Sequence, residues 1–224
     1  MMAFFGVIGK LVAGSGFEDV LFQAGLCSSG SISGVMSGKH YNRCWTVHEA
    51  FAEALERLFI ERFMPEVPEV LATFAQSSPG TEDVRGLFDE EIIVEYDSNY
   101  QALKASCLKG DFGKTPQFWC QYMKLVDRQH QFHYSINRND FDLRMLMWKE
   151  SLPLCFATNR LHYARYGTYY LKSLESLEFS RPGAKEELCQ QGLSVRCNKF
   201  GIGQAVDLAG EQTYMKSTKT AGLS

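Results

Sequence analysis

Helical periodicity is the feature that most constrains the fold of this chain, and it is clearest between Trp45 and Phe63. Apolar residues recur there every three or four positions, with glutamates between them, which places the apolar side chains on one face of an α-helix. Pro65 and Pro68 follow and would end this helix, because proline cannot donate the backbone hydrogen bond that a helix interior needs. The apolar positions are Val47, Phe51, Ala54, Leu55, Leu58, Phe59 and Phe63.

The same periodicity predicts helices in the second half of the chain. The stretch from Ile92 to Leu103 favours a helix over a strand because of its length. Thr115 is expected to cap the next helix at its N-terminus, with Pro116 as the first helical residue. Asp140 is expected to start a helix that is apolar nearly all round and therefore central in the fold.

Three further segments complete the predicted architecture. Residues 161–179 are expected to form a helix with Tyr163, Tyr166 and Tyr170 on one side. Residues 25–34, rich in Gly and Ser, predict a loop, and only residues 193–197 predict a strand. The sequence therefore predicts a mainly α fold, a multi-helix array with at most one or two short β-strands near the C-terminus.

Composition indicates a globular chain. Hydrophobic residues make up 45% and charged residues 22%, values that favour neither disorder nor a fibrous architecture. We expect a single mostly helical domain over residues 1–224, with a helical region at 1–192 and a strand and final helix at 193–224. The net charge of −3 gives no general attraction to the phosphates of nucleic acid, so a dedicated nucleic-acid-binding domain is not expected.

The cysteines and the apolar segments indicate the compartment. The chain has seven cysteines, an odd and scattered set that fits reduced thiols in the cytosol or nucleus. The apolar opening at residues 3–13 carries Lys10 and lacks a basic leading segment, which does not fit a signal sequence. No other apolar run approaches the roughly 20 residues of a membrane helix. We expect an intracellular chain that does not enter a membrane, with nucleus and cytoplasm not distinguished.

One segment contains fragments of two nucleotide-binding motifs. Residues 110–115 read Gly-Asp-Phe-Gly-Lys-Thr. A phosphate-binding loop would need glycine where Leu108 stands, and the other motifs of a protein kinase are absent. The segment is therefore interpreted as a turn followed by a helix cap.

Metal ligation has two sets of candidate residues. Cys27, His40, Cys44 and His48 offer ligand types that suit tetrahedral zinc, and the last two would lie one helical turn apart. The usual leading Cys-x-x-Cys pair is missing, so we expect no stoichiometric zinc.

The second set is acidic. Asp207 and Glu211 stand four positions apart, would share a face of a helix and could offer carboxylates to a divalent metal.

Several short passages carry a resemblance to a known family. They are residues 14–19, 40–45, 53–57, 112–119, 163–166 and 205–212, among them Phe-Gly-Lys-Thr-Pro-Gln-Phe-Trp and Ala-Val-Asp-Leu-Ala-Gly-Glu-Gln. In their order and spacing they resemble an uncharacterised family of transposable-element origin in animal genomes. The resemblance runs from about Phe4 to Leu223 and covers the helical insertion and C-terminal part of a ribonuclease H-like transposase.

The resemblance implies a role for Glu211 as the last acid of a three-acid site that holds two Mg²⁺ or Mn²⁺ ions for DNA strand cleavage. The earlier acids would lie on strands upstream of Met1, so the chain is expected to be truncated relative to its family. The strand at residues 193–197 would then lack its neighbours and present an unpaired edge that favours self-association.

These observations lead to one expected function and two alternatives. We expect a transposon-derived or truncated protein without enzymatic activity or cofactor, serving as a helical interaction module. One alternative is a subunit or remnant of a metal-dependent DNA transposase or nuclease, with DNA as partner and Mg²⁺ or Mn²⁺ as cofactor. The other is a zinc-stabilised binding module around Cys44 and His48.

Overall fold

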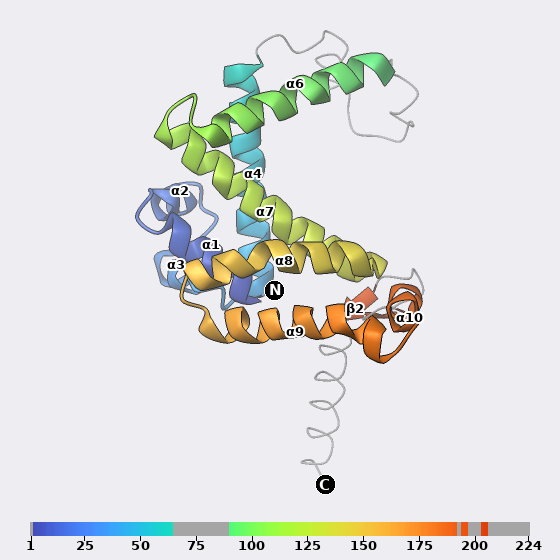
Figure 1. The fold of residues 1–224 in the computed structure, drawn as a ribbon. Coiled ribbons are helices and arrows are strands. Elements are labelled where there is room, and N and C mark those ends of the chain that lie inside the picture. Colours follow the sequence, from blue (N-terminus) through green and yellow to red (C-terminus); the bar gives the residue numbers. More distant parts are fainter. Residues whose placement is uncertain (1, 65–89, 192–193, 197–202, 206–224) are drawn as a thin grey trace. The chain divides into compact units, whose positions relative to one another are not determined.

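The computed structural model is mainly α-helical over the residues it describes, which are 2–64, 90–191, 194–196 and 203–205 (Figure 1). The predicted fold class is confirmed. The helices in chain order are α1 (Met2–Val12), α2 (Phe17–Gln23), α3 (Ser29–Met36), α4 (Tyr41–Phe63), α6 (Glu90–Lys109), α7 (Lys114–Arg138), α8 (Phe141–Ala157), α9 (Leu161–Ser180) and α10 (Ala184–Gln191). Among these helices, none combines the length and the apolar character needed to cross a bilayer.

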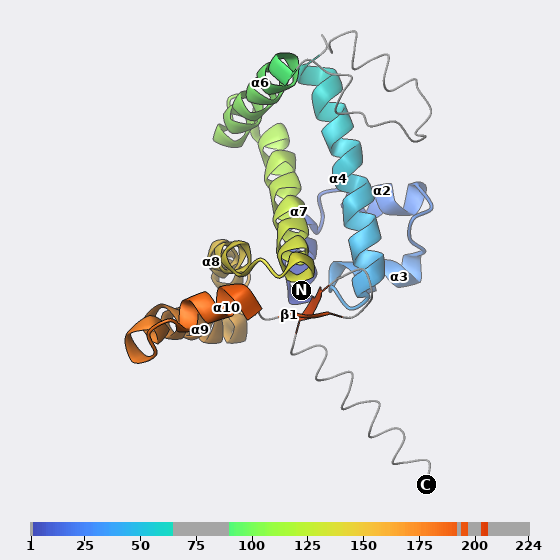
Figure 2. The same ribbon diagram turned by 90° about the vertical axis from the view of Figure 1, so that its right-hand side faces the viewer.

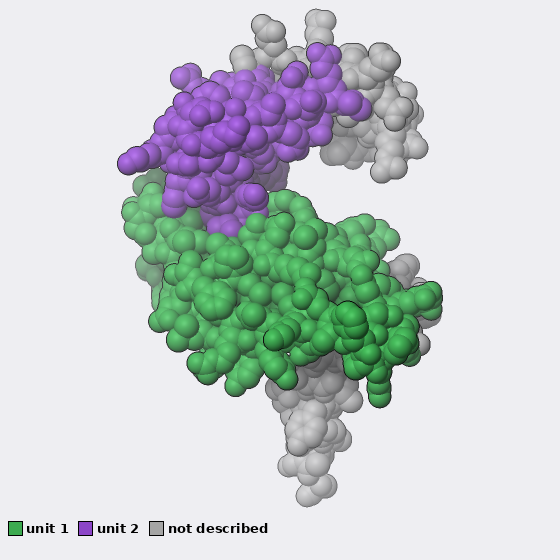
Figure 3. All heavy atoms as spheres, viewed as in Figure 1, with its two compact units in different colours: residues 1–44, 127–224 green, residues 45–126 purple. Residues whose placement is uncertain are grey.

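The chain divides into two compact units (Figure 3). Unit 1 consists of residues 1–44 and 127–224, and unit 2 consists of residues 45–126. The chain passes from unit 1 to unit 2 within α4 and returns within α7, since each of these helices includes residues of both units. Unit 1 is therefore assembled from two segments that are distant in sequence.

In unit 1, α1 packs against α3 with the two backbones in close approach. Gly9 lies so near the carbonyl of Met36 that a Cβ atom at this position would overlap it. Glycine permits this approach because it has no side chain. Phe5, Ile8 and Val35 are buried in the same unit and supply apolar surface to its core.

The prediction of a loop over residues 25–34 is wrong for its second half, where α3 begins at Ser29. Ser28 precedes the helix in the extended conformation of an N-cap residue, with φ −77° and ψ 156°. Serine and glycine have low helix propensity, but Val35 of the same helix is completely buried. The burial of the Val35 side chain therefore outweighs the preference of the Gly and Ser residues for a loop.

Helices α8 and α9 run side by side in unit 1, as both ribbon views show (Figures 1 and 2). The predicted start of α8 is confirmed, since the Asp140 carboxylate accepts a hydrogen bond of 2.9 Å from the backbone N–H of Leu143. The helix is not buried all round as its composition predicts, because Leu146 and Phe156 are exposed. Its apolar residues thus contribute to the surface as well as to the core.

The close packing of α9 on α8 depends on Gly167. A Cβ atom at this position would lie 2.7 Å from Leu152 Cδ2 and 2.9 Å from Trp148 Cζ2, both on α8. These separations are shorter than carbon atoms tolerate without displacement. Gly167 therefore sets how near the two helices can approach.

Unit 2 contains the helix that the sequence predicts most clearly, residues 45–63 of α4, together with α6 and the first part of α7. Aromatic rings join them: the Phe51 ring centroid lies 5.4 Å from that of Trp119 and 5.6 Å from that of Tyr122. An ion pair of 2.9 Å between Lys104 Nζ and Glu56 Oε1 links α6 to α4. The helices predicted over residues 45–63 and from Ile92 to Leu103 are confirmed by α4 and α6.

The start of α7 differs from the prediction by a residue or two. The helix begins at Lys114, before the predicted N-cap Thr115. Gly113 precedes it with φ 96°, a left-handed conformation that glycine adopts without strain. This glycine turns the chain from α6 into α7, as the turn interpretation of residues 110–115 requires.

The two short strands of the described chain form an antiparallel hairpin. β1 (Ser194–Arg196) lies within the predicted strand and pairs with β2 (Gly203–Ala205), with Val195 opposite Gln204. The expectation that this strand lacks a neighbour is wrong, because β2 follows it in the chain and supplies one.

Candidate functional site

Glu211, to which the resemblance gives a catalytic role, and Asp207, which is a candidate through its spacing from Glu211, both lie outside the described residues. Their roles remain predictions.

The four zinc candidates are not brought together by the structure. Cys44 is buried in unit 1, and its thiol donates a hydrogen bond of 3.5 Å to the Val35 carbonyl. Burial is the main cause that raises the pKa of the Cys44 thiol, and the nearby Cys27 raises it further. His40 is exposed and lies against Gly34, whereas His48 belongs to unit 2. Within the described ranges, no three His, Cys, Asp or Glu side chains converge as metal ligands would.

His48 instead takes part in a buried hydrogen bond of unit 2. Its Nδ1 atom lies 2.8 Å from the hydroxyl oxygen of Tyr122, and both side chains are almost inaccessible to solvent. Burial lowers the pKa of His48 from 6.5 to about 4 and raises the pKa of Tyr122, because desolvation disfavours the charged form of each. The pair is therefore neutral at physiological pH, which suits a structural role.

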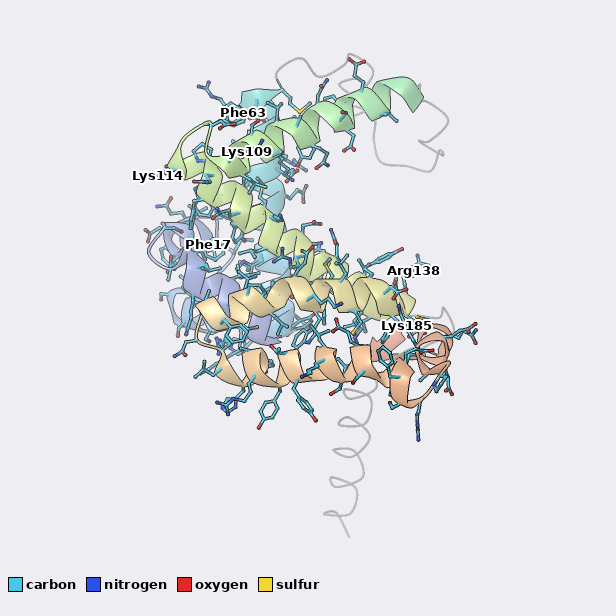
Figure 4. All side chains as sticks on the ribbon, viewed as in Figure 1. Phe17, Phe63, Lys109, Lys114, Arg138 and Lys185 are labelled. Atoms are coloured by element: carbon cyan, nitrogen blue, oxygen red, sulfur yellow. The ribbon has the colours of Figure 1, made fainter. Side chains whose placement is uncertain are left out.

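The most distinctive surface of unit 1 is a set of tyrosines on α9. Tyr163, Tyr166, Tyr169 and Tyr170, here called the tyrosine face, are all exposed, with Tyr166 at 65% and Tyr169 at 71%. The Tyr166 ring stacks on the ring of His162 at an interplanar angle of 7°. Side chains project from α9 on the side away from α8 (Figure 4).

The tyrosine face stays exposed because α9 buries only a narrow stripe. Ala164, Gly167 and Leu171 are the buried positions of this helix, and they follow the three- and four-residue spacing of a single face. Because successive residues of a helix are rotated by 100°, the four tyrosine positions lie beside that stripe and not within it. The sequence pattern places Tyr163, Tyr166 and Tyr170 on one side, but it gives no signal that this side remains uncovered.

The chain belongs to the family described as Domain of unknown function (DUF8702), whose model matches residues 1–224. No curated protein and no solved structure matches the chain. Its function therefore has to be inferred from its own side chains and surfaces.

Proposed function

We propose that this chain is a non-enzymatic helical interaction module that pairs with a second copy of itself through the tyrosine face of α9. The exposure of Tyr163, Tyr166, Tyr169 and Tyr170 on one helix carries the proposal. Tyrosine is enriched at protein interfaces, because its ring buries a large apolar area while its hydroxyl group can still form hydrogen bonds. Four such rings on one helix exceed what a solvated surface needs.

The charge pattern of α9 favours a second copy over an oppositely charged partner. In a two-fold symmetric contact each surface meets itself, so a charged patch would repel its own image. The tyrosine face contains no Lys, Arg, Asp or Glu, while Arg165 and Lys172 lie elsewhere around the helix. An uncharged aromatic surface can therefore face itself without electrostatic repulsion.

The test compares the solution mass of two double variants with that of the wild-type chain. Tyr166→Glu with Tyr169→Glu adds two negative charges to the tyrosine face. Arg165→Gln with Lys172→Gln changes the net charge by the same amount on another side of α9. Sedimentation equilibrium is expected to give a dimer for the wild type and for the Arg165/Lys172 variant, and a monomer for the tyrosine variant.

Two results would contradict the proposal. One is a wild-type chain that remains monomeric at about 100 μM, a concentration that detects even weak association. The other is a tyrosine variant that keeps the wild-type mass while its circular dichroism shows an intact helical fold. Circular dichroism on all variants separates lost association from lost folding.

We also propose that the module derives from a transposable element. The order and spacing of the family-like passages, such as residues 112–119 and 205–212, support this origin. The resemblance assigns one acid of this chain, Glu211, to the three-acid site, and one such carboxylate cannot hold two metal ions, so we expect no cleavage or joining of DNA with Mg²⁺ or Mn²⁺. Strand cleavage that is lost in Glu211→Gln would instead favour the transposase alternative.

The zinc alternative has its own measurement. Elemental analysis of the purified chain is expected to find no stoichiometric zinc. One zinc per chain that disappears in Cys44→Ser would favour a zinc-stabilised module.

A further inference from the structure

Two thiols lie in contact in the interior of unit 2. The Sγ atom of Cys120, on α7, donates a hydrogen bond of 2.9 Å to the Sγ atom of Cys107, on α6. Cys107 is completely buried and Cys120 is 2% exposed, and both are free thiols. Packing alone does not require two thiols in contact, because a buried cysteine behaves as a small hydrophobe that other small residues could replace.

The end of α6 holds Cys107 in a defined position. Gly110 follows the helix with φ 96°, and its backbone N–H donates a hydrogen bond of 3.0 Å to the Cys107 carbonyl. The N–H of Asp111 donates a bond of 3.2 Å to the Ser106 carbonyl. These two bonds form a Schellman motif, which ends a helix in one fixed backbone geometry.

A side chain of α7 adds a second link across the turn that separates Lys109 from Lys114 (Figure 4). Gln117 Nε2 donates a hydrogen bond of 2.8 Å to the Leu108 carbonyl at the end of α6. The first part of α7 is thereby held next to the last turn of α6, where the two thiols meet. The thiol pair is therefore preorganised by contacts on both sides of the turn.

Preorganisation removes the main obstacle to a bond between the two sulfur atoms. Cys107 and Cys120 are 13 positions apart, so an unfolded chain loses loop entropy when it joins them. The folded chain has already closed this loop. Because coupling between two equilibria is reciprocal, a fold that favours the disulfide is stabilised by the disulfide to the same extent.

We propose that Cys107 and Cys120 are a disulfide site, at which a low-molecular-weight disulfide oxidises unit 2 and joins α6 covalently to α7. The thiolate of one cysteine attacks a sulfur of the oxidant, forms a mixed disulfide and releases one small thiol. The thiolate of the other cysteine then attacks the protein sulfur of the mixed disulfide, and the second small thiol leaves. The two cysteines lose two protons and two electrons, and the oxidant accepts them and becomes two thiols.

Burial slows this reaction without changing its equilibrium. Burial and the hydrogen bond to Cys107 raise the pKa of Cys120 to about 12, so its thiolate is scarce while unit 2 is closed. The oxidant therefore reacts when the end of α6 opens locally, and closing brings the second thiol to the mixed disulfide. The site responds to a sustained oxidising environment and not to a brief one.

The experiment measures the equilibrium constant for the disulfide in buffers of reduced and oxidised glutathione. The full-length chain is brought to equilibrium from its reduced and its oxidised form, both folded and in urea that unfolds it. Trypsin cleaves after Lys104, Lys109, Lys114 and Lys124, so the disulfide joins peptide 105–109 to peptide 115–124 in the mass spectrum. We expect a constant about a hundredfold larger in the folded chain, because folding has already closed the loop.

Variants and a melting curve connect the effect to this pair. Cys120→Ser is expected to leave peptide 105–109 without a partner. Cys155→Ser removes a buried free thiol of unit 1 and is expected to leave the equilibrium unchanged. The oxidised wild-type chain is expected to unfold roughly 10 °C above the reduced chain, a difference that Cys120→Ser abolishes. If Cys120→Ser fails to fold, the comparison of the folded and unfolded wild-type chain still tests the site.

A larger constant in the folded chain, together with the joined peptides and the higher melting temperature, supports the site. A folded-state constant equal to or below the value in urea overturns it, because the native geometry then opposes the bond. Joining of either peptide to a different cysteine of the folded chain, in place of this pair, also overturns it. So does an oxidised chain that melts at the same temperature as the reduced chain. These results are independent of the tyrosine face, which belongs to unit 1.

Discussion

His48 shows how burial changes the chemistry of one side chain. In the folded chain its pKa is about 4, lowered by desolvation, whereas a histidine in an unfolded chain titrates near 6.5. At a pH between about 4 and about 6.5, His48 binds a proton in the unfolded state but not in the folded state. Acid therefore favours the unfolded state in this window, and stability is fully present only above about pH 6.5.

We predict that the free energy of unfolding falls as the pH drops from about 6.5 to about 4, and that His48→Gln removes this part of the fall. The contribution of His48 is about 3 kcal/mol at most, since one pKa unit corresponds to 1.36 kcal/mol. Urea unfolding at several pH values measures it, and His162→Gln, at an exposed position, is the control. A His48→Gln chain with the wild-type pH dependence would disprove the assignment.

A second residue-scale prediction concerns the thiols of unit 2. The Sγ atoms of Cys107 and Cys120 lie 2.9 Å apart, and both residues are buried. Burial and the hydrogen bond to Cys107 raise the pKa of Cys120 to about 12, so its reactive thiolate form is nearly absent at neutral pH. Cys120 is expected to resist iodoacetamide at pH 8 in the folded chain and to react after unfolding in urea.

Mass spectrometry of the alkylated chain identifies the labelled positions. Cys189, which is partly exposed, serves as the internal reference for a reachable thiol. Equal labelling of Cys120 and Cys189 in the native chain would contradict the prediction.

At the scale of elements, the contact between α8 and α9 depends on a position without a side chain. Gly167→Val is expected to destabilise unit 1 by about 1–3 kcal/mol, because the added methyl groups overlap Trp148 and Leu152. Thermal unfolding followed by circular dichroism measures the loss. Ser176→Val puts the same side chain at an exposed site of α9 and is expected to change the free energy of unfolding only by the small difference in helix propensity between serine and valine. Similar losses in both variants would show that packing is not the cause.

Elements with a continuous apolar stripe could be predicted from the sequence, whereas those formed by tertiary contacts could not. Residues 45–63 and 161–179 follow a helical period because burial of one face imposes it. Helix α3 was not predicted, because its Gly and Ser residues favour a loop. The helix is stabilised by the burial of Val35, which the local sequence does not indicate. The spacing of the tyrosines on α9 was visible, but their exposure depends on which face packs on α8. Phe4 and Tyr163 line one small cavity of unit 1, and this was not predictable, because the two residues are distant in sequence and come near each other only in the folded chain.

At the scale of the whole molecule, unit 1 depends on its N-terminal helix although most of the unit comes from the second half of the chain. Ile8 is completely buried, whereas Leu11 on the same helix is 41% exposed. We predict that Ile8→Ala destabilises unit 1 by about 2–5 kcal/mol and that Leu11→Ala has little effect. Hydrogen exchange should show lost protection in α8 and α9 for Ile8→Ala alone. Unchanged protection there would mean that α1 does not support these helices.

The joining of distant segments in unit 1 also has a consequence for synthesis on the ribosome. Lys10 donates a hydrogen bond to the Thr158 carbonyl, a contact between residues 148 positions apart. At about 5–20 residues per second, α1 leaves the ribosome on the order of ten seconds before Thr158, the residue that caps the C-terminus of α8, is synthesised. During that interval the nascent chain can cover α1 only with early neighbours such as α3. During synthesis the apolar side of α1 is thus exposed surface of the kind that chaperones protect from aggregation, before it becomes part of a core.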